Sequence, residues 1–194
     1  MKVAITFIGT NRYLDYLPKY YENIEKYFLP NTEKVILAFT DGELNDTPDN
    51  LKVYHQEHLE WPFITLKRFE IINKARDVIE ECDWLVFLDA DAIPVTTITE
   101  EEFFTDKPLF GVHHPCHYLG MDPHTKAPGA YEQNPKCEAY VDVSKSLPPV
   151  YWQGCLWGGK VPHVCAMIDE LEARVNRDLE NDIVAVWHLS LIHI

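Results

Sequence analysis

Basic residues are scarce in this sequence. Seventeen Lys and Arg stand against 31 Asp and Glu, so the 194-residue chain carries a formal net charge of −14. A protein that binds a nucleic-acid backbone needs a basic face, and the composition therefore argues against nucleic acid as a partner. An anionic ligand would need local help from a metal ion or a placed arginine.

Long apolar runs are also missing, since the longest are far too short to cross a bilayer. Met1-Lys2-Val3 leads directly into a predicted strand, and we expect no membrane span, signal peptide or anchor. A cytoplasmic location is therefore expected.

Several chemical signatures are absent. The five cysteines are odd in number and have no C-x-x-C or Cys/His spacing, so reduced thiols are expected in place of a zinc site or disulfide framework. No G-x-G-x-x-G or G-x-x-x-x-G-K-[ST] follows the first predicted strand, which continues into Gly9-Thr10-Asn11. This disfavours the nucleotide enzymes that carry those loops.

What the sequence does contain is an ordinary globular composition, with 46% hydrophobic and 25% charged residues and no internal repeat. The length suits one well-packed domain over residues 1–194.

A short apolar run, Trp84 to Leu88, is followed by two carboxylates, Asp89 and Asp91. Its length and its aromatic and branched residues favour a strand buried on both faces over a helix. Open α/β sheets bind ligands at the carboxyl ends of their strands, and alternate residues of an extended segment point the same way. The pair is predicted to face one divalent ion. The alternative is that one Asp caps the next element and the other is merely solvated.

Hydrophobic patterns predict the other elements of the first half. Strands are predicted at 3–8, 34–39 and 51–55. A helix between the first two is expected to start at Asp15, with Pro18 in its first turn. A long helix after Trp61-Pro62 is expected to bury one face and to carry arginines on its other faces. The buried positions would be Leu66, Phe69, Ile72 and Ile79, and the arginines Arg68 and Arg76.

This order of strands and helices predicts an α/β fold with a mostly parallel sheet flanked by helices. Beyond the acidic pair, Thr99 and Glu102 have the spacing of a capping box. The second half is expected to contain a strand at 108–114, a long loop at 116–148 and a helix at 161–175. Residues 149–159 mix aromatics with glycines, which indicates either close backbone approach to something flat or bulky, or a bulged core strand. Another helix or strand is expected to begin at 182–187.

Eight motifs, in this order, resemble glycosyltransferase family 6, the retaining α-1,3-galactosyl- and N-acetylgalactosaminyltransferases that include the blood-group A and B enzymes. They are Phe7 to Tyr13, Phe39-Thr40-Asp41, Trp61-Pro62 with Thr65 to Phe69, Asp83 to Asp91, Leu109 to Pro115, Ala130-Tyr131-Glu132 with Ala139-Tyr140, Tyr151 to Gly159, and Ala185 to His188. The resemblance implies a GT-A fold, in which one Rossmann-like sheet binds a nucleotide-sugar donor at the Asp-x-Asp end. It also implies a nucleotide-sugar-binding half at about 1–92 and an acceptor-binding half at about 93–188, incomplete at its C-terminus.

The resemblance assigns donor binding to residues of the first strand and loop, the arginine-bearing helix, the acidic pair and the glycine-rich stretch. These are Phe7, Ile8, Gly9, Tyr13, Trp61, Arg68, Asp89, Ala90, Asp91, Gly154 and Cys155. The donor would be UDP-galactose or UDP-N-acetylgalactosamine, with Mn²⁺ or Mg²⁺ on Asp89 and Asp91. Arg68 would contact the diphosphate or the donor sugar, and Tyr13 would stack on uracil; without the resemblance, each reads as an ordinary surface or core residue.

Acceptor binding, to a galactoside or oligosaccharide, is assigned by the same resemblance. The residues are His114, Ala130, Gln153, Trp187 and His188. Ala130 replaces a polar Thr, so one acceptor contact is expected to be missing. Cys155 stands where the N-acetylgalactosamine enzymes often carry Gly, which leaves less room and favours galactose.

The sequence departs from the family after His188. The family continues with Asp-Glu-Ser, in which the Glu is the candidate nucleophile, whereas this chain continues with Leu189-Ser190-Leu191. No catalytic residue can therefore be named, and we expect a truncated or misread end. The alternatives are a true short variant and a non-catalytic UDP-sugar-binding protein. The 194-residue chain is expected to bind UDP and metal weakly and to transfer sugar poorly.

Overall fold

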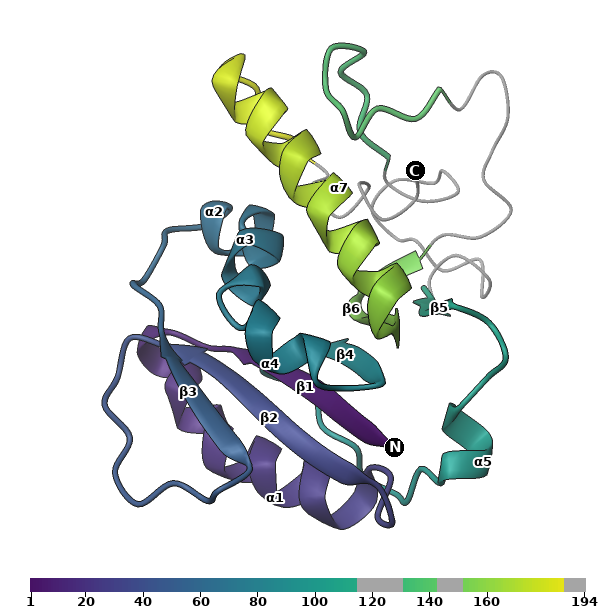
Figure 1. Ribbon diagram of the computed structural model, residues 1–194. Helices are drawn as coiled ribbons and strands as arrows, with labels where there is room; N and C mark the ends of the chain where they lie inside the picture. The colour runs from purple at the N-terminus through teal and green to yellow at the C-terminus, as the bar shows by residue number, and fades with distance from the viewer. Residues whose placement is uncertain (115–130, 143–151, 187–194) are drawn as a thin grey trace.

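The computed structural model describes residues 1–114, 131–142 and 152–186, and its centre is a six-stranded sheet in the order β3-β2-β1-β4-β6-β5 (Figure 1). The strands are β1 (Lys2–Ile8), β2 (Glu33–Thr40), β3 (Leu51–His55), β4 (Trp84–Leu88), β5 (Leu109–His113) and β6 (Trp152–Lys160). Strands β3, β2, β1 and β4 run parallel, whereas β6 is antiparallel to both β4 and β5. The predicted α/β fold with a mostly parallel sheet is confirmed.

Helices cover both faces of this sheet. They are the 3-10 helix η1 (Asn11–Tyr16) and the α-helices α1 (Leu17–Tyr27), α2 (Phe63–Leu66), α3 (Arg68–Asn73), α4 (Arg76–Glu80), α5 (Glu100–Phe103) and α7 (Val161–Glu180). Figure 1 shows α1 on one side of the sheet, with α2 to α4 and the long α7 on the other. None of the helices in the described ranges combines the length and apolarity that a membrane span requires.

Alternating side chains divide the interior into two cores. On β1, Val3, Ile5 and Phe7 pack toward α1, whereas Ala4 packs with α2 to α4 and α7. The same alternation along β4 explains its unbroken apolar run, since each side chain enters one core or the other. Burying one such large side chain is worth about 1.5–3 kcal/mol, so the two cores fix β4 at the centre of the sheet.

Two helix predictions need correction. Helix α1 starts at Leu17 with Tyr16 as its N-cap, and Asp15 lies within η1 instead of capping the helix; Pro18 is in the first turn as predicted. The predicted long helix is three short ones, because the backbone leaves helical geometry at Lys67 (ψ 10°) and at Ala75 (φ −107°, ψ 20°).

These breaks change which side chains face inward. The predicted buried positions of that segment, among them Phe69 and Ile72, are buried, but Arg68 is buried with them at 6% exposure. The capping box of Thr99 and Glu102 at α5 is confirmed.

The described part of the glycine-rich stretch, residues 152–159, belongs to the bulged strand β6, whose pairing with β5 shifts register between Gly111 and Val112; residues 149–151 lie outside the described residues. A Cβ at Gly158 would lie 2.2 Å from the carbonyl oxygen of Leu85, so the close approach is to the neighbouring strand β4.

After β6 the predicted helix at 161–175 is confirmed as α7, which extends to Glu180. It ends in a Schellman turn: Asp182 has φ 56°, and the amide of Ile183 donates to the carbonyl of Asp178 at 2.8 Å. This turn reverses the chain, and residues 182–186 form neither the helix nor the strand predicted from 182 onward.

Candidate functional site

A cavity of about 660 Å³ opens at the carboxyl ends of β1 and β4. It is lined by Ile8, Thr10, Asn11, Arg12, Tyr13, His58, Leu59, Glu60, Trp61, Ile64, Thr65, Arg68, Phe87, Asp89, Ala90 and Asp91. Its position is the one at which open α/β sheets bind ligands, and its volume is in the range of small-molecule and cofactor sites.

Asp89 and Asp91 both line this cavity, but not as alternate residues of an extended strand. Strand β4 ends at Leu88, and a turn follows in which the amide of Ala92 donates to the carbonyl of Asp89 at 3.0 Å. The amide of Asp89 in turn donates to the carbonyl of Cys155 on β6 at 2.9 Å. The turn leaves Asp89 half-buried and Asp91 exposed.

The surroundings of Asp89 disfavour the ionised form of its carboxyl group. Burial raises the pKa of its carboxyl group, the negative charge of Asp91 raises it further, and Arg68 opposes both. A bound cation would relieve the repulsion between the two carboxylates. Within the described residues, no group of three or more His, Cys, Asp and Glu side chains could hold a metal ion by itself.

Arg68 is a buried cation beside the acidic pair. Its Nε donates to the carbonyl of Thr65 at 2.8 Å and its Nη1 to the carbonyl of Gly154 at 3.1 Å. The guanidinium carbon lies 5.0 Å from the centre of the Phe87 ring. Burial lowers the pKa of Arg68, but an arginine remains charged at neutral pH.

Two adjacent residues of β6 thus hold two of the charged residues of the site: the carbonyl of Gly154 accepts from the Arg68 side chain, and the carbonyl of Cys155 accepts from the amide of Asp89.

The first loop is fixed mainly by backbone contacts. The amide of Gly9 donates to the carbonyl of Phe39 at 3.0 Å. Asn11 has φ 54°, and its amide donates to both carboxylate oxygens of Asp41, at 2.9 and 3.1 Å. These contacts present Tyr13, which is 40% exposed, to the cavity.

The structure brings together seven of the eleven predicted donor-binding residues. Ile8, Tyr13, Trp61, Arg68, Asp89, Ala90 and Asp91 line the cavity. The other four do not line it: Phe7 is fully buried in the core under α1, Gly9 sits against the Phe7 ring, and Gly154 and Cys155 support the site from β6.

Two of the five predicted acceptor residues are among the described residues, and both lie outside the cavity lining. Gln153 on β6 is opposite Val112, and His114 directly follows β5; neither lines the cavity. Ala130, Trp187 and His188 fall outside the described residues.

Sequence reasoning named no role for the other nine lining residues. Five of them lie within motifs that resemble the family, so those motifs taken as a whole point to them: Thr10, Asn11, Arg12, Thr65 and Phe87. His58, Leu59 and Glu60 lie in a segment between β3 and α2 that has neither hydrophobic period nor motif. Only the fold, which places the ends of β1, β3 and β4 at one edge, brings that segment to the cavity.

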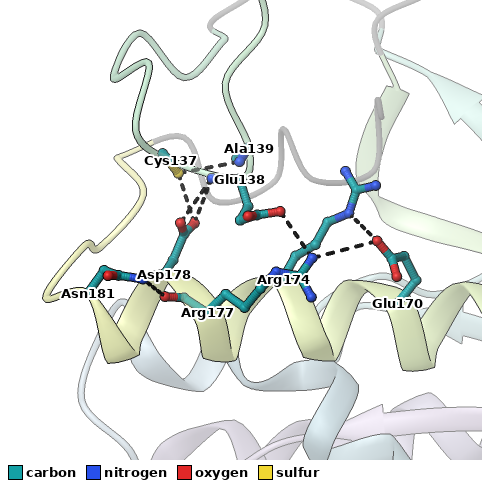
Figure 2. A network of polar contacts seen from close by, with 8 residues as sticks. All are labelled: Cys137, Glu138, Ala139, Glu170, Arg174, Arg177, Asp178 and Asn181. Atoms are coloured by element: carbon teal, nitrogen blue, oxygen red, sulfur yellow. Dashed lines mark hydrogen bonds and ion pairs between the residues drawn. The ribbon is translucent and has the colours of Figure 1, made fainter.

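Near the C-terminal end of α7, a polar network holds the segment 131–142 (Figure 2). Asp178, 5% exposed, accepts from the Cys137 thiol at 3.0 Å and from the Glu138 amide at 2.9 and 3.2 Å. Glu138 also pairs with Arg177 at 3.1 Å. Burial and the hydrogen bond to Asp178 raise the pKa of Cys137 to about 12, so its thiol is protonated at neutral pH.

A second buried carboxylate links the same segment to the end of the described chain. Glu132, 3% exposed, accepts from the amide of Val186 at 2.7 Å and from that of Asn134 at 2.9 Å. Residues 131–142 are therefore fixed to α7 and to residues 183–186, although they contain no helix or strand of their own.

The fold and the cavity define a class: an α/β domain with a cavity at the carboxyl ends of its parallel strands, beside an acidic pair and a buried arginine. A sequence model of glycosyltransferase family 6 matches residues 1–191. The chain belongs to this family of glycosyltransferases, and it has a GT-A-like fold.

Individual relatives agree. The O-antigen biosynthesis glycosyltransferase WbnI of Escherichia coli is 27% identical over 190 residues, covering 97% of this chain and 78% of the relative. The rat histo-blood group ABO system transferase 2 is 24% identical, covering 96% of this chain and 56% of the relative. The mouse globoside alpha-1,3-N-acetylgalactosaminyltransferase 1 is also 24% identical, with coverages of 96% and 54%. The chain thus spans about half the length of these mammalian relatives.

Proposed function

We propose that this protein is a metal-dependent retaining glycosyltransferase that moves galactose or N-acetylgalactosamine from a UDP-sugar to a galactoside in α-1,3 linkage. The observation that carries the proposal is that Asp89, Asp91 and Arg68 line one cavity at the carboxyl end of β4. A UDP leaving group concentrates negative charge, and this arrangement offers both a cation site and a buried arginine to stabilise it.

The acidic pair fits a divalent ion. Mn²⁺ and Mg²⁺ prefer carboxylate and phosphate oxygens and keep several ligands from substrate and water, which suits a site with two protein carboxylates. Asp89 and Asp91 would hold the ion. When bound, it would neutralise charge on the departing diphosphate.

The remaining residues act on the donor directly. Arg68 is held with its Nε and Nη1 on backbone carbonyls, which leaves Nη2 and the second Nη1 hydrogen for diphosphate or sugar oxygens. Tyr13 and Trp61, 40% and 73% exposed, offer aromatic faces for the base. Burial of Arg68, which is 6% exposed, strengthens its contacts by excluding water.

Two observations bear on the donor sugar, and they point in opposite directions; the one from this chain's own sequence decides the proposal. The mouse globoside relative is named for transfer of N-acetylgalactosamine in α-1,3 linkage. In this chain, Cys155 stands where the N-acetylgalactosamine enzymes often carry Gly; it does not line the cavity, but its carbonyl accepts from the amide of Asp89, so a side chain at this position bears on how the acidic pair is placed. We therefore propose galactose as the preferred donor sugar.

A second function, a UDP-sugar-binding protein without transfer activity, is favoured by one observation. Leu189-Ser190-Leu191 occupies the positions at which the family carries Asp-Glu-Ser, including the candidate nucleophile.

Titration calorimetry with UDP, with and without MnCl₂, tests the binding part of the proposal on the native chain, on Asp91→Asn and on Asp49→Asn, an exposed control. Manganese should tighten UDP binding at least about ten-fold in the native chain and in the control, and much less in Asp91→Asn. Equal UDP affinity with and without manganese in all three proteins would contradict metal dependence.

Turnover then separates the two functions. UDP release from UDP-galactose and from UDP-N-acetylgalactosamine is measured with a galactoside acceptor present and absent. Acceptor-stimulated release, slow because Asp-Glu-Ser is replaced after His188 but faster with UDP-galactose than with UDP-N-acetylgalactosamine, is the expected result for the transferase. Tight UDP-sugar binding without any acceptor-stimulated release would favour the binding protein.

A further inference from the structure

A histidine without an assigned role joins two walls of the cavity. Thr10, which follows β1, and His58, between β3 and α2, both line it. Thr10 Oγ1 lies 2.9 Å from Nδ1 of His58. Because Thr10 is only 4% exposed, its hydroxyl is fixed inside the protein, and the contact sets the orientation of the histidine ring.

Both walls are anchored independently of this contact. The amide of Gly9 donates to the backbone of β2 at 3.0 Å, which fixes the loop that carries Thr10. On the other side, the amide of Gln56 donates to the carbonyl of Thr40 at 2.9 Å, and Lys74 Nζ donates to Oε1 of Gln56 at 2.7 Å. The His58 ring is therefore positioned from fixed backbone on two sides, as a preorganised binding group requires.

The second ring nitrogen of His58 is available to a ligand. Nε2 lies 4.0 Å from Oε1 of Glu60, beyond hydrogen-bonding distance, and 40% of the His58 side chain is exposed. A hydroxyl both donates and accepts, so Nδ1 can accept from Thr10 in one neutral tautomer or donate to it in the charged ring; in the other neutral tautomer Nδ1 donates to Thr10 and Nε2 is an acceptor. In the first two forms, which the inference concerns, Nε2 carries a proton that it can donate to an oxygen atom in the cavity.

The charged side chains of the cavity do not by themselves balance an anionic ligand, so an additional hydrogen-bond donor is useful there. The lining contains two arginines, Arg12 and Arg68, against three carboxylates, Glu60, Asp89 and Asp91. A nucleoside diphosphate adds further negative charge, so a hydrogen-bond donor in the cavity lining contributes to binding.

We infer that His58 is a nucleotide-binding residue, with Nδ1 held by Thr10 and with Nε2–H donating to an oxygen of the bound nucleoside diphosphate. The inference rests on the proposed function, because it takes the cavity to be a nucleotide-sugar site. A hydrogen bond to a charged group contributes enough that its loss should weaken UDP binding about ten-fold or more.

Two variants separate the roles of the two nitrogens. The amide of His58→Asn lies near the position of Nδ1 and can keep the contact to Thr10, but it leaves nothing at Nε2. The longer His58→Gln brings an amide near the position of Nε2. His163→Asn, an exposed change on α7, is the matched control. By calorimetry with UDP and MnCl₂, we expect about ten-fold weaker binding for His58→Asn, within about three-fold of native for His58→Gln, and no change for the control.

Nuclear magnetic resonance on the native chain tests the same contact without relying on a variant that must fold. In two-bond ¹H–¹⁵N spectra of histidine-labelled protein, UDP should shift the Nε2 signal of His58 and leave the signals of His163 unchanged.

The outcomes are distinct. If the native chain binds no UDP, the proposed function falls together with this inference. If the native chain binds UDP but a folded His58→Asn binds it equally well, or the Nε2 signal does not move, the inference alone is overturned. Equal weakening in the Asn and Gln variants also overturns it, because loss of wall structure then explains the effect.

Discussion

Replacing Arg68 by lysine keeps the charge and removes the planar fork, which isolates the part played by geometry. Arg68 donates through Nε to Thr65 and through Nη1 to Gly154, at 2.8 and 3.1 Å, and is 6% exposed. A lysine ammonium is a single point, and at this site it can reach at most one of the two carbonyls.

The size of the effect follows from those contacts. Hydrogen bonds that involve a charged group are worth about 1.5–3 kcal/mol each, and the carbonyl of the buried Gly154 or of Thr65 would lose its partner. Arg68→Lys should therefore lower the free energy of unfolding by about 2–3 kcal/mol. The same substitution at Arg174, which pairs with the exposed Glu170 at 2.7 Å, should cost less than about 1 kcal/mol.

Urea unfolding at neutral pH measures both losses, and calorimetry with UDP and manganese measures the binding. UDP affinity should fall about ten-fold in Arg68→Lys and stay unchanged in Arg174→Lys. Equal stability losses in the two variants would refute the view that the backbone carbonyls position Arg68. A large stability loss with native UDP affinity would refute its place in the donor site.

Two further predictions concern acidity. Burial raises the pKa of the Asp89 carboxyl group in the folded state above its unfolded-state value. The protonated carboxyl group therefore contributes to stability at acidic pH. This contribution is lost as the pH rises from the unfolded-state pKa through the folded-state pKa. Asp89→Asn should remove this decline and increase the free energy of unfolding at pH 7, and it should weaken manganese-dependent UDP binding. Urea titrations from pH 4 to 7 measure the stability. A variant less stable than the native chain would contradict the view that the charge of Asp89 is unfavourable in the folded state. The Cys137 thiol has a pKa of about 12 and donates a hydrogen bond to Asp178, so it should resist iodoacetamide at pH 8 in the native chain and react in Asp178→Ala. Mass spectrometry measures the alkylation. Equally fast alkylation in both proteins would argue against the contact.

Local patterns predicted most of the elements because those patterns report burial directly. The side chains from Trp84 to Leu88 point alternately into the two cores. A strand that is covered on both faces therefore needs no alternation of apolar and polar residues. The capping box at Thr99 depends on contacts within one turn, so nothing remote could override it.

Predictions failed where a remote contact decided the outcome. The segment after Pro62 has a helical period, yet it breaks at Lys67 and Ala75. The breaks carry Arg68 inward, where Gly154, 86 residues further along the chain, accepts its hydrogen bond. A period calculated along one segment contains no information about that partner.

The sequence by itself determined the sheet's strands, the position of the acidic pair after the central strand, and membership of a family through motifs in a fixed order. Those properties depend on neighbouring residues, whose spacing sets which side chains share a face. The tertiary structure decided which residues share the cavity. It bent the chain at Asp89 into a turn, took Gly154 and Cys155 out of the lining, and placed His58 opposite Thr10. These are contacts between segments far apart in the chain, and only the packing of both cores against the twisted sheet fixes their distances.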